Sequence, residues 1–196
     1  MHTRNLTVSL TAAAMLLATA PAIAGGVDAA MVSNTCAGCH GTNGVSEGEA
    51  PTIAGLPKEY LVSAMKTYRD DSRYSTIMGR IAKGYSDAEI DAMATFFAEQ
   101  TWKPAAQETD PELVARGQTL HGEKFCGGCH GAGGEMSNDT TPQIAGQYAG
   151  YLYFQMLDIA NPDTPISEGS KMMRTLFQAL TEDDLKALAH FYASQQ

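Results

Sequence analysis

Five residues of this chain, CAGCH at positions 36–40, recur as CGGCH at positions 126–130. The two copies contain all four cysteines of the sequence, so the chain builds the same small site twice. Two thiols and an imidazole at this spacing can bind zinc, form a redox disulfide or carry a covalently attached haem. The surrounding sequence has to decide among these three.

The surroundings favour haem c. A thioredoxin-type disulfide would need a βαβ context, which the flanking residues do not show. A zinc site usually draws its ligands from two such clusters, but the segment between these clusters is long enough to fold by itself. Haem c explains every feature, because each thiol adds to one vinyl group and the next histidine binds the iron. We therefore expect two covalently bound haem c groups, held by Cys36, Cys39, His40, Cys126, Cys129 and His130.

An internal repeat explains why the motif occurs twice. The sequence PTIAGLPKEYL at positions 51–61 returns as PQIAGQYAGYL at 142–152, and SDAEIDAMATFFAEQ at 86–100 returns as TEDDLKALAHFYASQ at 181–195. These matches predict two similar domains, residues 25–100 and 111–196. The segment between them, residues 101–110, contains a proline and mixed charges and is a plausible linker.

The apolar periodicity predicts an all-α fold. Capping signals at Ser86 and, more loosely, at Thr181 precede the last predicted helix of each domain. Further helices are expected before each CxxCH motif, at residues 28–35 and 112–124, and after it, at 58–68 and 150–160. No segment shows convincing strand alternation. Each domain is too small to hold a large apolar core, so the buried porphyrin is expected to supply it.

A methionine is the expected sixth iron ligand in each domain. Counting back seven residues from the position before the last predicted helix gives Met78 in the first copy and Met173 in the second. Met172 competes with Met173, but its repeat equivalent is Ile77, which cannot bind iron. The remaining candidates, His121 and His190, do not form a repeated pair, and we expect both at the surface. His/Met ligation raises the reduction potential and closes the iron to small ligands.

The N-terminus predicts export. Residues 1–24 contain a basic n-region, a short apolar stretch and an A-x-A site, which are typical of a signal peptide cleaved after Ala24. No later segment is long and apolar enough to span a membrane, so the mature chain is expected to be soluble and periplasmic. It has 12 basic and 22 acidic residues, a net charge of −10 that argues against nucleic acid as a partner. No G-x-G-x-x-G fingerprint predicts a FAD or NAD site on this chain.

The order CxxCH, P-x-I-A-G and a methionine before a terminal helix resembles class I cytochrome c domains. That resemblance implies that the carbonyls of Pro51 and Pro142 accept hydrogen bonds from the haem-binding histidines. The tandem arrangement resembles cytochrome c4. Three shorter stretches, STIMGRIAKGY at 75–85, QTWKPA at 100–105 and the terminal FYASQQ, are similar to the dihaem subunit of flavocytochrome c sulfide dehydrogenase.

Two roles follow from this resemblance, and in neither is the chain an enzyme on its own. As the sulfide dehydrogenase subunit, it would take electrons from a separate FAD-binding chain and deliver them to a soluble acceptor cytochrome. As a free-standing carrier, it would move electrons from a membrane complex to a terminal oxidase. A dihaem peroxidase or a thiosulfate-oxidising cytochrome is a third possibility. The first would need an iron open to substrate, and the second would need a fifth cysteine for thiolate ligation.

Overall fold

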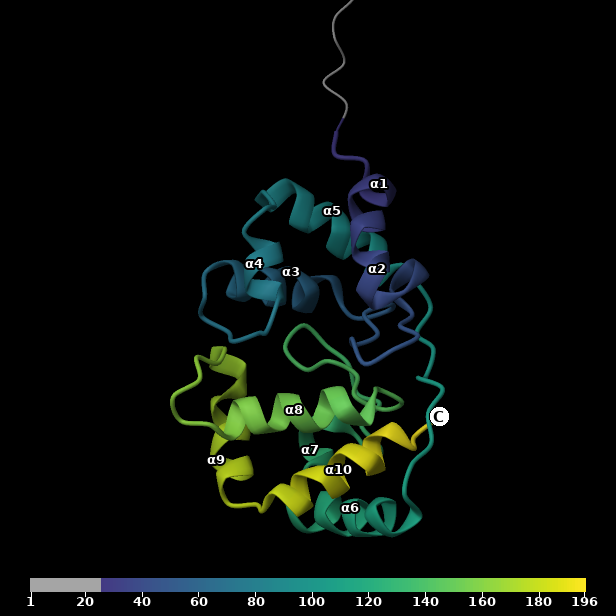
Figure 1. Cartoon of the computed structure of the whole chain (residues 1–196), viewed down its shortest axis with the longest axis vertical. Helices are drawn as coiled ribbons and strands as arrows, with labels where there is room; N and C mark the ends of the chain where they lie inside the picture. Colours follow the sequence, from purple (N-terminus) through teal and green to yellow (C-terminus); the bar gives the residue numbers. More distant parts are fainter. Residues whose placement is uncertain (1–25) are drawn as a thin grey trace, which may run out of the picture.

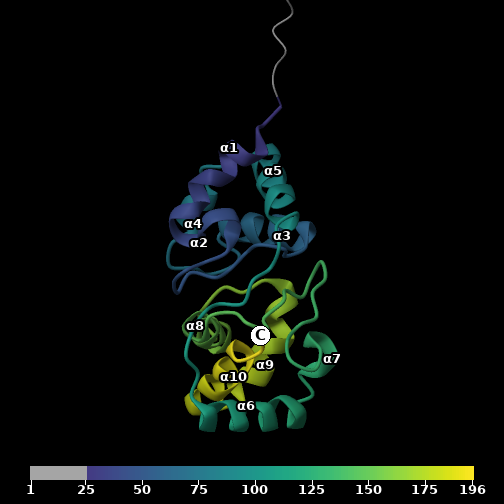
Figure 2. The same cartoon turned by 90° about the vertical axis from the view of Figure 1, so that its right-hand side faces the viewer.

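A computed structural model describes residues 26–196, and the predicted signal peptide lies outside these described residues. Two helical domains are stacked along the long axis of the molecule (Figure 1). Within residues 26–196 the chain forms helices and turns but no strand, which confirms the expected all-α class. The turned view shows the same two-part arrangement, with the first domain at the N-terminal end (Figure 2).

The first domain consists of short helices around the CAGCH motif followed by three helices. Their bounds are α1 Ala29–Ser33, the 3₁₀ turn η1 Asn34–Cys36, α2 Ala37–His40, the 3₁₀ turn η2 Thr42–Gly44, α3 Lys58–Arg69, α4 Met78–Ala82 and α5 Asp87–Ala98. The carboxylate of Asp28 caps α1 by accepting a hydrogen bond from the Met31 N–H at 2.9 Å.

The second domain repeats this order with a longer first helix. Its elements are α6 Pro111–Glu123, α7 Gly127–His130, α8 Ala149–Ala160, the 3₁₀ turn η3 Glu168–Ser170, α9 Lys171–Gln178 and α10 Glu182–Ala193. Asp110 caps α6, and Pro111 occupies its first turn, where a missing N–H costs nothing. The expected helices at 112–124, 150–160 and 181–195 all form, with ends within two residues of the predicted ones.

Capping boxes start the last helix of both domains. Ser86 accepts a hydrogen bond from the Glu89 N–H at 3.3 Å, and the Glu89 carboxylate accepts one from the Ser86 N–H at 2.8 Å. Thr181 and Asp184 form the same reciprocal pair at 3.2 and 3.0 Å, so the looser sequence signal builds a complete box. Each box satisfies two N–H groups that the helix itself leaves unpaired.

Replacing Thr181 with alanine is expected to destabilise the protein by about 1 kcal/mol, because it removes the cap of the helix at the centre of the second domain. Equilibrium unfolding of the haem-loaded protein measures this change. Thr119→Ala is the control, since its hydroxyl only bonds a carbonyl on the exposed side of α6 and its loss should cost less than about 0.5 kcal/mol. Equal losses in the two variants would contradict the capping role.

The two domains have apolar cores of unequal size. In the second domain, α10 packs between α6 and α8, and eight buried residues form one cluster: Leu152, Met156, Phe177, Leu185, Leu188, Ala189, Phe191 and Tyr192. The α6–α10 contact is close at Gly117, where a Cβ atom would collide with the carbonyl of Ala187. In the first domain only Leu56, Leu61, Ala94 and Phe97 form such a cluster, and Cys36 packs against it. The first core therefore leaves much of the apolar burial to another group.

The two P-x-I-A-G segments meet at the boundary between the domains. The Thr52 N–H donates to Gln147 Oε1 and the Gln147 side-chain amide donates to the Thr52 carbonyl, both at 3.0 Å and both buried. Tyr148 adds a hydrogen bond to the Ser46 carbonyl at 3.1 Å. Residues 101–110 run along the second domain, where the Ala105 N–H donates to the Gly146 carbonyl at 2.7 Å. These paired hydrogen bonds fix how the domains sit on each other.

Candidate haem sites

The first CxxCH motif lies on η1 and α2, one helical turn that brings its three functional side chains together. Cys36 is half-buried, Cys39 is exposed, and neither forms a disulfide. His40 is only 8% exposed, and its Nδ1 lies 2.7 Å from the Pro51 carbonyl oxygen. Because a carbonyl can only accept, Nδ1 carries the proton and the neutral ring keeps the lone pair of Nε2 for a metal.

Burial supports the same protonation state at His40. It lowers the pKa of the imidazole, and the bond to the Pro51 carbonyl only partly opposes this shift. Burial likewise raises the pKa of the Cys36 thiol. A neutral histidine with a fixed ring is the form that binds a metal ion.

The second motif, on α7, has the same elements but lacks one hydrogen bond. Cys126 is half-buried, Cys129 is exposed, and neither forms a disulfide. Burial and the nearby His121 lower the pKa of His130. In contrast with His40, the Nδ1 atom of His130 is buried without a hydrogen-bond partner among the described residues, and no bond to the Pro142 carbonyl forms. A hydrogen bond therefore fixes the ring orientation of His40, and within residues 26–196 no such bond fixes that of His130.

The two methionines named from the repeat lie on the segments before the last helices. Met78 is the first residue of α4, and Met173 lies in α9; both are partly buried. Met173 packs against the core cluster of the second domain, whereas Met172 is 70% exposed. Ile77, the repeat equivalent of Met172, is 47% exposed. In each domain the helix with the methionine lies apart from the helix with the CxxCH histidine (Figure 1).

The expectation that His121 and His190 lie at the surface is wrong for His121. Its side chain is 8% exposed, and its Nδ1 lies 3.0 Å from the Tyr192 hydroxyl. The cause is the close packing of α6 on α10, which encloses the end of α6 against Phe191 and Tyr192. His190 is partly exposed, and its Nδ1 accepts a hydrogen bond from the Asp110 N–H at 3.1 Å.

The donor set fits haem c better than a structural metal ion. Within residues 26–196 no group of three or more His, Cys, Asp or Glu side chains could hold a metal. Each motif offers two cysteines outside any disulfide and one imidazole whose pKa is lowered by burial, which is the set that thioether attachment and one axial bond require. The small apolar core of the first domain is a feature of a chain that folds around a further group.

A cytochrome c family model matches residues 28–101 and again residues 114–196. The chain belongs to the cytochrome c family. Each match covers one of the two helical domains and one CxxCH motif, so the protein is a tandem pair of cytochrome c domains with two covalently bound haem c groups. Within residues 26–196 none of the helices of this cytochrome is long and apolar enough to cross a membrane.

Relatives that match most of the chain are named as cytochromes c4 and as electron acceptors of thiosulfate dehydrogenase. The cytochrome is 30% identical to cytochrome c4 of Pseudomonas aeruginosa over 80% of this chain and 81% of the relative. It is 29% identical to the thiosulfate dehydrogenase electron acceptor of Thiomonas intermedia over 82% of this chain and 78% of the relative. The crystal structure of reduced recombinant cytochrome c4 from Pseudomonas stutzeri superimposes with a TM-score of 0.75 at 25% identity, covering 86% of this chain and 99% of that one. The chain is thus a cytochrome c4-like electron-transfer protein.

One further relative matches a shorter stretch at higher identity. The cytochrome subunit of sulfide dehydrogenase from Chlorobaculum tepidum is 44% identical over 73 residues, which are 37% of this chain and 66% of the relative. The similarity to that subunit expected from the sequence is therefore present over part of the chain only.

Proposed function

We propose that this cytochrome is the electron-transfer subunit of a sulfide dehydrogenase, exported to the periplasm and cleaved after Ala24. It would accept electrons from a separate FAD-binding chain and deliver them to a soluble acceptor cytochrome. The 44% identical stretch supports the proposal. The observation that carries it is an apolar surface at the start of α4. Ile77, the N-cap residue, and Ile81, whose N–H donates to the Ile77 carbonyl at 3.2 Å, are 47% and 38% exposed.

This surface adjoins the proposed sixth ligand of the first iron. Met78 follows Ile77 directly, so a partner that covers the two isoleucines would lie close to the first haem. Large exposed apolar side chains that adjoin each other are typical of a binding surface, and a permanent partner buries more of them than a transient one. The first domain is therefore the proposed docking side for the flavin chain.

Within each domain the proposed roles follow the sequence assignment. Cys36, Cys39, Cys126 and Cys129 form the thioethers, His40 and Met78 bind the first iron, and His130 and Met173 bind the second. Haem c supplies a reversible one-electron couple, and methionine ligation favours its reduced state. The chain contributes shielding, ring orientation through Pro51 and a surface for its partners.

The second candidate is a free-standing carrier. The cytochrome c4 and thiosulfate dehydrogenase electron-acceptor relatives support it, because they match about four fifths of the chain rather than one third. A carrier of net charge −10 would be drawn to basic partners by long-range attraction. Its association rate with them would therefore fall steeply as the ionic strength rises.

Ile81→Glu separates the two candidates. If the flavin chain docks on α4, a buried carboxylate should weaken its binding at least about tenfold and slow the reduction of the haems by sulfide in the complex. Binding can be measured by co-purification from the native periplasm and by titration of the flavoprotein. Phe154→Glu is the matched control, because Phe154 is 61% exposed on α8 of the other domain and its replacement should change nothing.

Two results would favour the carrier instead. One is recovery of the wild-type cytochrome as a flavin-free monomer from its native host. The other is sulfide oxidation that survives deletion of its gene. Equal binding of the flavoprotein to wild type and to Ile81→Glu would show that the flavin chain does not dock on α4.

A further inference from the structure

The loop that leads to Met173 is longer than its counterpart in the first domain. Helices α3 and α8 are equivalent in the repeat, and each has 12 residues. The stretch from the end of α8 to Thr181 is four residues longer than the stretch from the end of α3 to Ser86. The extra residues lie in the α8–α9 loop, residues 161–170. A longer loop costs more entropy to hold in one conformation, so the second domain needs further contacts to fix it.

Arg174, on α9, ties this loop to the end of α8. Its Nε donates to the Ile159 carbonyl in the last turn of α8 at 2.8 Å, and a terminal nitrogen of its guanidinium donates to the Thr164 carbonyl in the loop. Gln178, one turn further along α9, donates to the Ala160 carbonyl at 2.9 Å. Because the last carbonyls of a helix have no partner within that helix, two side chains of α9 cap the end of α8.

The first domain has no side chain at the place of Arg174. Gly79 is the repeat equivalent of Arg174. A Cβ atom at Gly79 would lie 3.5 Å from the carbonyl oxygen of Tyr68, which is the repeat equivalent of Ile159. The position therefore faces the same helix-end carbonyl in both copies. The copy with the longer loop is the one in which a side chain binds that carbonyl.

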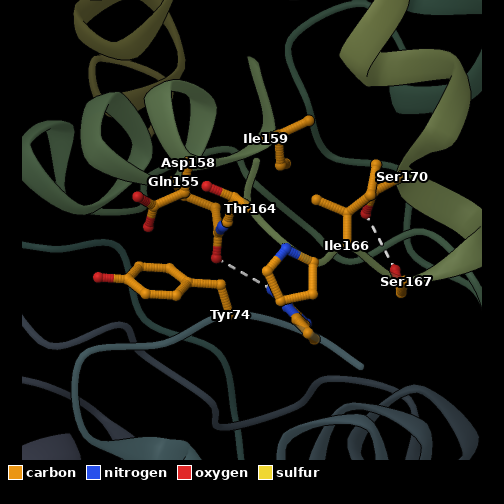
Figure 3. Close-up of a pocket in the computed structure, with 10 residues that line it drawn as sticks. Tyr74, Gln155, Asp158, Ile159, Thr164, Ile166, Ser167 and Ser170 are labelled. Carbon is orange, nitrogen blue, oxygen red and sulfur yellow. Dashed lines mark hydrogen bonds between the residues drawn. The ribbon is translucent and has the colours of Figure 1, made fainter. Parts of the chain in front are cut away.

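The α8–α9 loop also lies against the first domain. The Tyr74 N–H donates to the Pro165 carbonyl at 2.9 Å. Beside this contact, Arg73 donates to Gln155 Oε1 on α8 at 3.0 Å (Figure 3). Thr164 is 9% exposed and borders a cavity of only about 10 Å³ (Figure 3). The loop is therefore closely packed, with Tyr74 holding it from the first domain and Arg174 holding it from within the second.

We propose that Arg174 is a positioning residue that keeps Met173 in place. The two residues are adjacent on α9, so the contacts that fix Arg174 to the end of α8 also fix the segment that carries Met173. Arg174 takes part in none of the ion pairs within residues 26–196, so its donors serve these carbonyls rather than a carboxylate. The inference rests on the proposed ligation of the second iron by Met173, and its test uses the dihaem chain without any partner.

Imidazole binding to the ferric protein tests the proposal, because added imidazole can reach an axial position only while the methionine has moved away. In Arg174→Leu, one haem should bind imidazole at least about tenfold faster than in wild type, since two hydrogen bonds from a charged donor are lost. The other haem should bind it at the wild-type rate. Gln178→Ala loses one neighbouring bond and should give a smaller increase at the same haem. Stopped-flow absorbance measures these rates, after the mass of each variant has shown two haems.

Two controls separate positioning from charge and from general stability. Lys171→Leu removes the same charge from the same segment, but Lys171 only forms an exposed ion pair with Glu168, so both rates should stay unchanged. Thr181→Ala destabilises the second domain at its last helix and leaves the Arg174 contacts intact. Its rates should stay within about twofold of wild type, because local opening of the loop does not require the whole domain to unfold.

The haem that responds has to be that of the second domain. Met173→Ala identifies it by removing its share of the weak sulfur-to-iron absorption band. Wild-type rates in Arg174→Leu, or equal increases in Arg174→Leu and Thr181→Ala, would overturn the positioning role while leaving the ligand assignment intact. If Arg174→Leu does not mature with two haems, wild-type rates in Gln178→Ala would overturn that role. A Met173→Ala variant that keeps the whole band would instead show that the ligand assignment is wrong, and the inference would fall with it.

Discussion

A chain in which Cys126 and Cys129 are both replaced by alanine is expected to leave the cell with one covalent haem instead of two. Its intact mass under denaturing conditions should exceed that of the mature chain by a single haem, whereas wild type should exceed it by two. The second domain should also lose its cooperative unfolding transition, because α7 would lose the group that its CxxCH motif holds. Small domains of this kind fold around their prosthetic group.

The matched variant replaces Cys36 and Cys39 and should lose the other haem. Its effect on stability should be at least as large, since the first domain has only four residues in its buried apolar cluster. A wild-type mass equal to that of the bare chain, with four titratable thiols, would rule out thioether attachment at both motifs.

Met173→Ala is expected to remove about half of the weak sulfur-to-iron absorption band at the red end of the ferric visible spectrum. It should also lower the potential of one haem strongly, because the thioether favours ferrous iron and a water or hydroxide ligand does not. Met78→Ala should remove the other half of the band. Visible spectra and redox titration of the two variants measure these changes.

Met172→Ala is the control that the structure supplies. Met172 is 70% exposed while Met173 packs against the core, so removal of Met172 should leave band and potentials intact. Loss of the band in Met172→Ala rather than Met173→Ala would mean that the repeats are aligned one residue out of register there.

The sequence predicted most of the helices because their signals are local. Apolar spacing and a capping residue fix a helix within one stretch of chain, as at Ser86 and Thr181, where the boxes form as expected. The CxxCH motifs are equally local, since one turn of helix carries both thiols and the imidazole. Sequence reasoning therefore identified the candidate site, and the cytochrome c family matches support its haem chemistry.

Features that depend on packing between distant segments were not predicted. His121 lies in α6 with no sequence mark that separates it from a surface histidine, and it is buried because α10 crosses at Gly117. Arg73 has no equivalent in the second copy, so the repeat did not single it out, and its neighbour Gln155 comes from the other domain. The missing bond at His130 also breaks the repeat, although the two motifs are nearly identical in sequence.

The segment at Pro51 and Thr52 both orients the haem-binding histidine of the first domain and holds the second domain in place. The Pro51 carbonyl orients the ring of His40, and the next residue, Thr52, makes two buried hydrogen bonds to Gln147 of the second domain. A displacement of the second domain would therefore pull on the peptide that aligns the imidazole of the first. A partner that binds only the second domain would therefore change the reduction potential of the first haem without contacting the first domain.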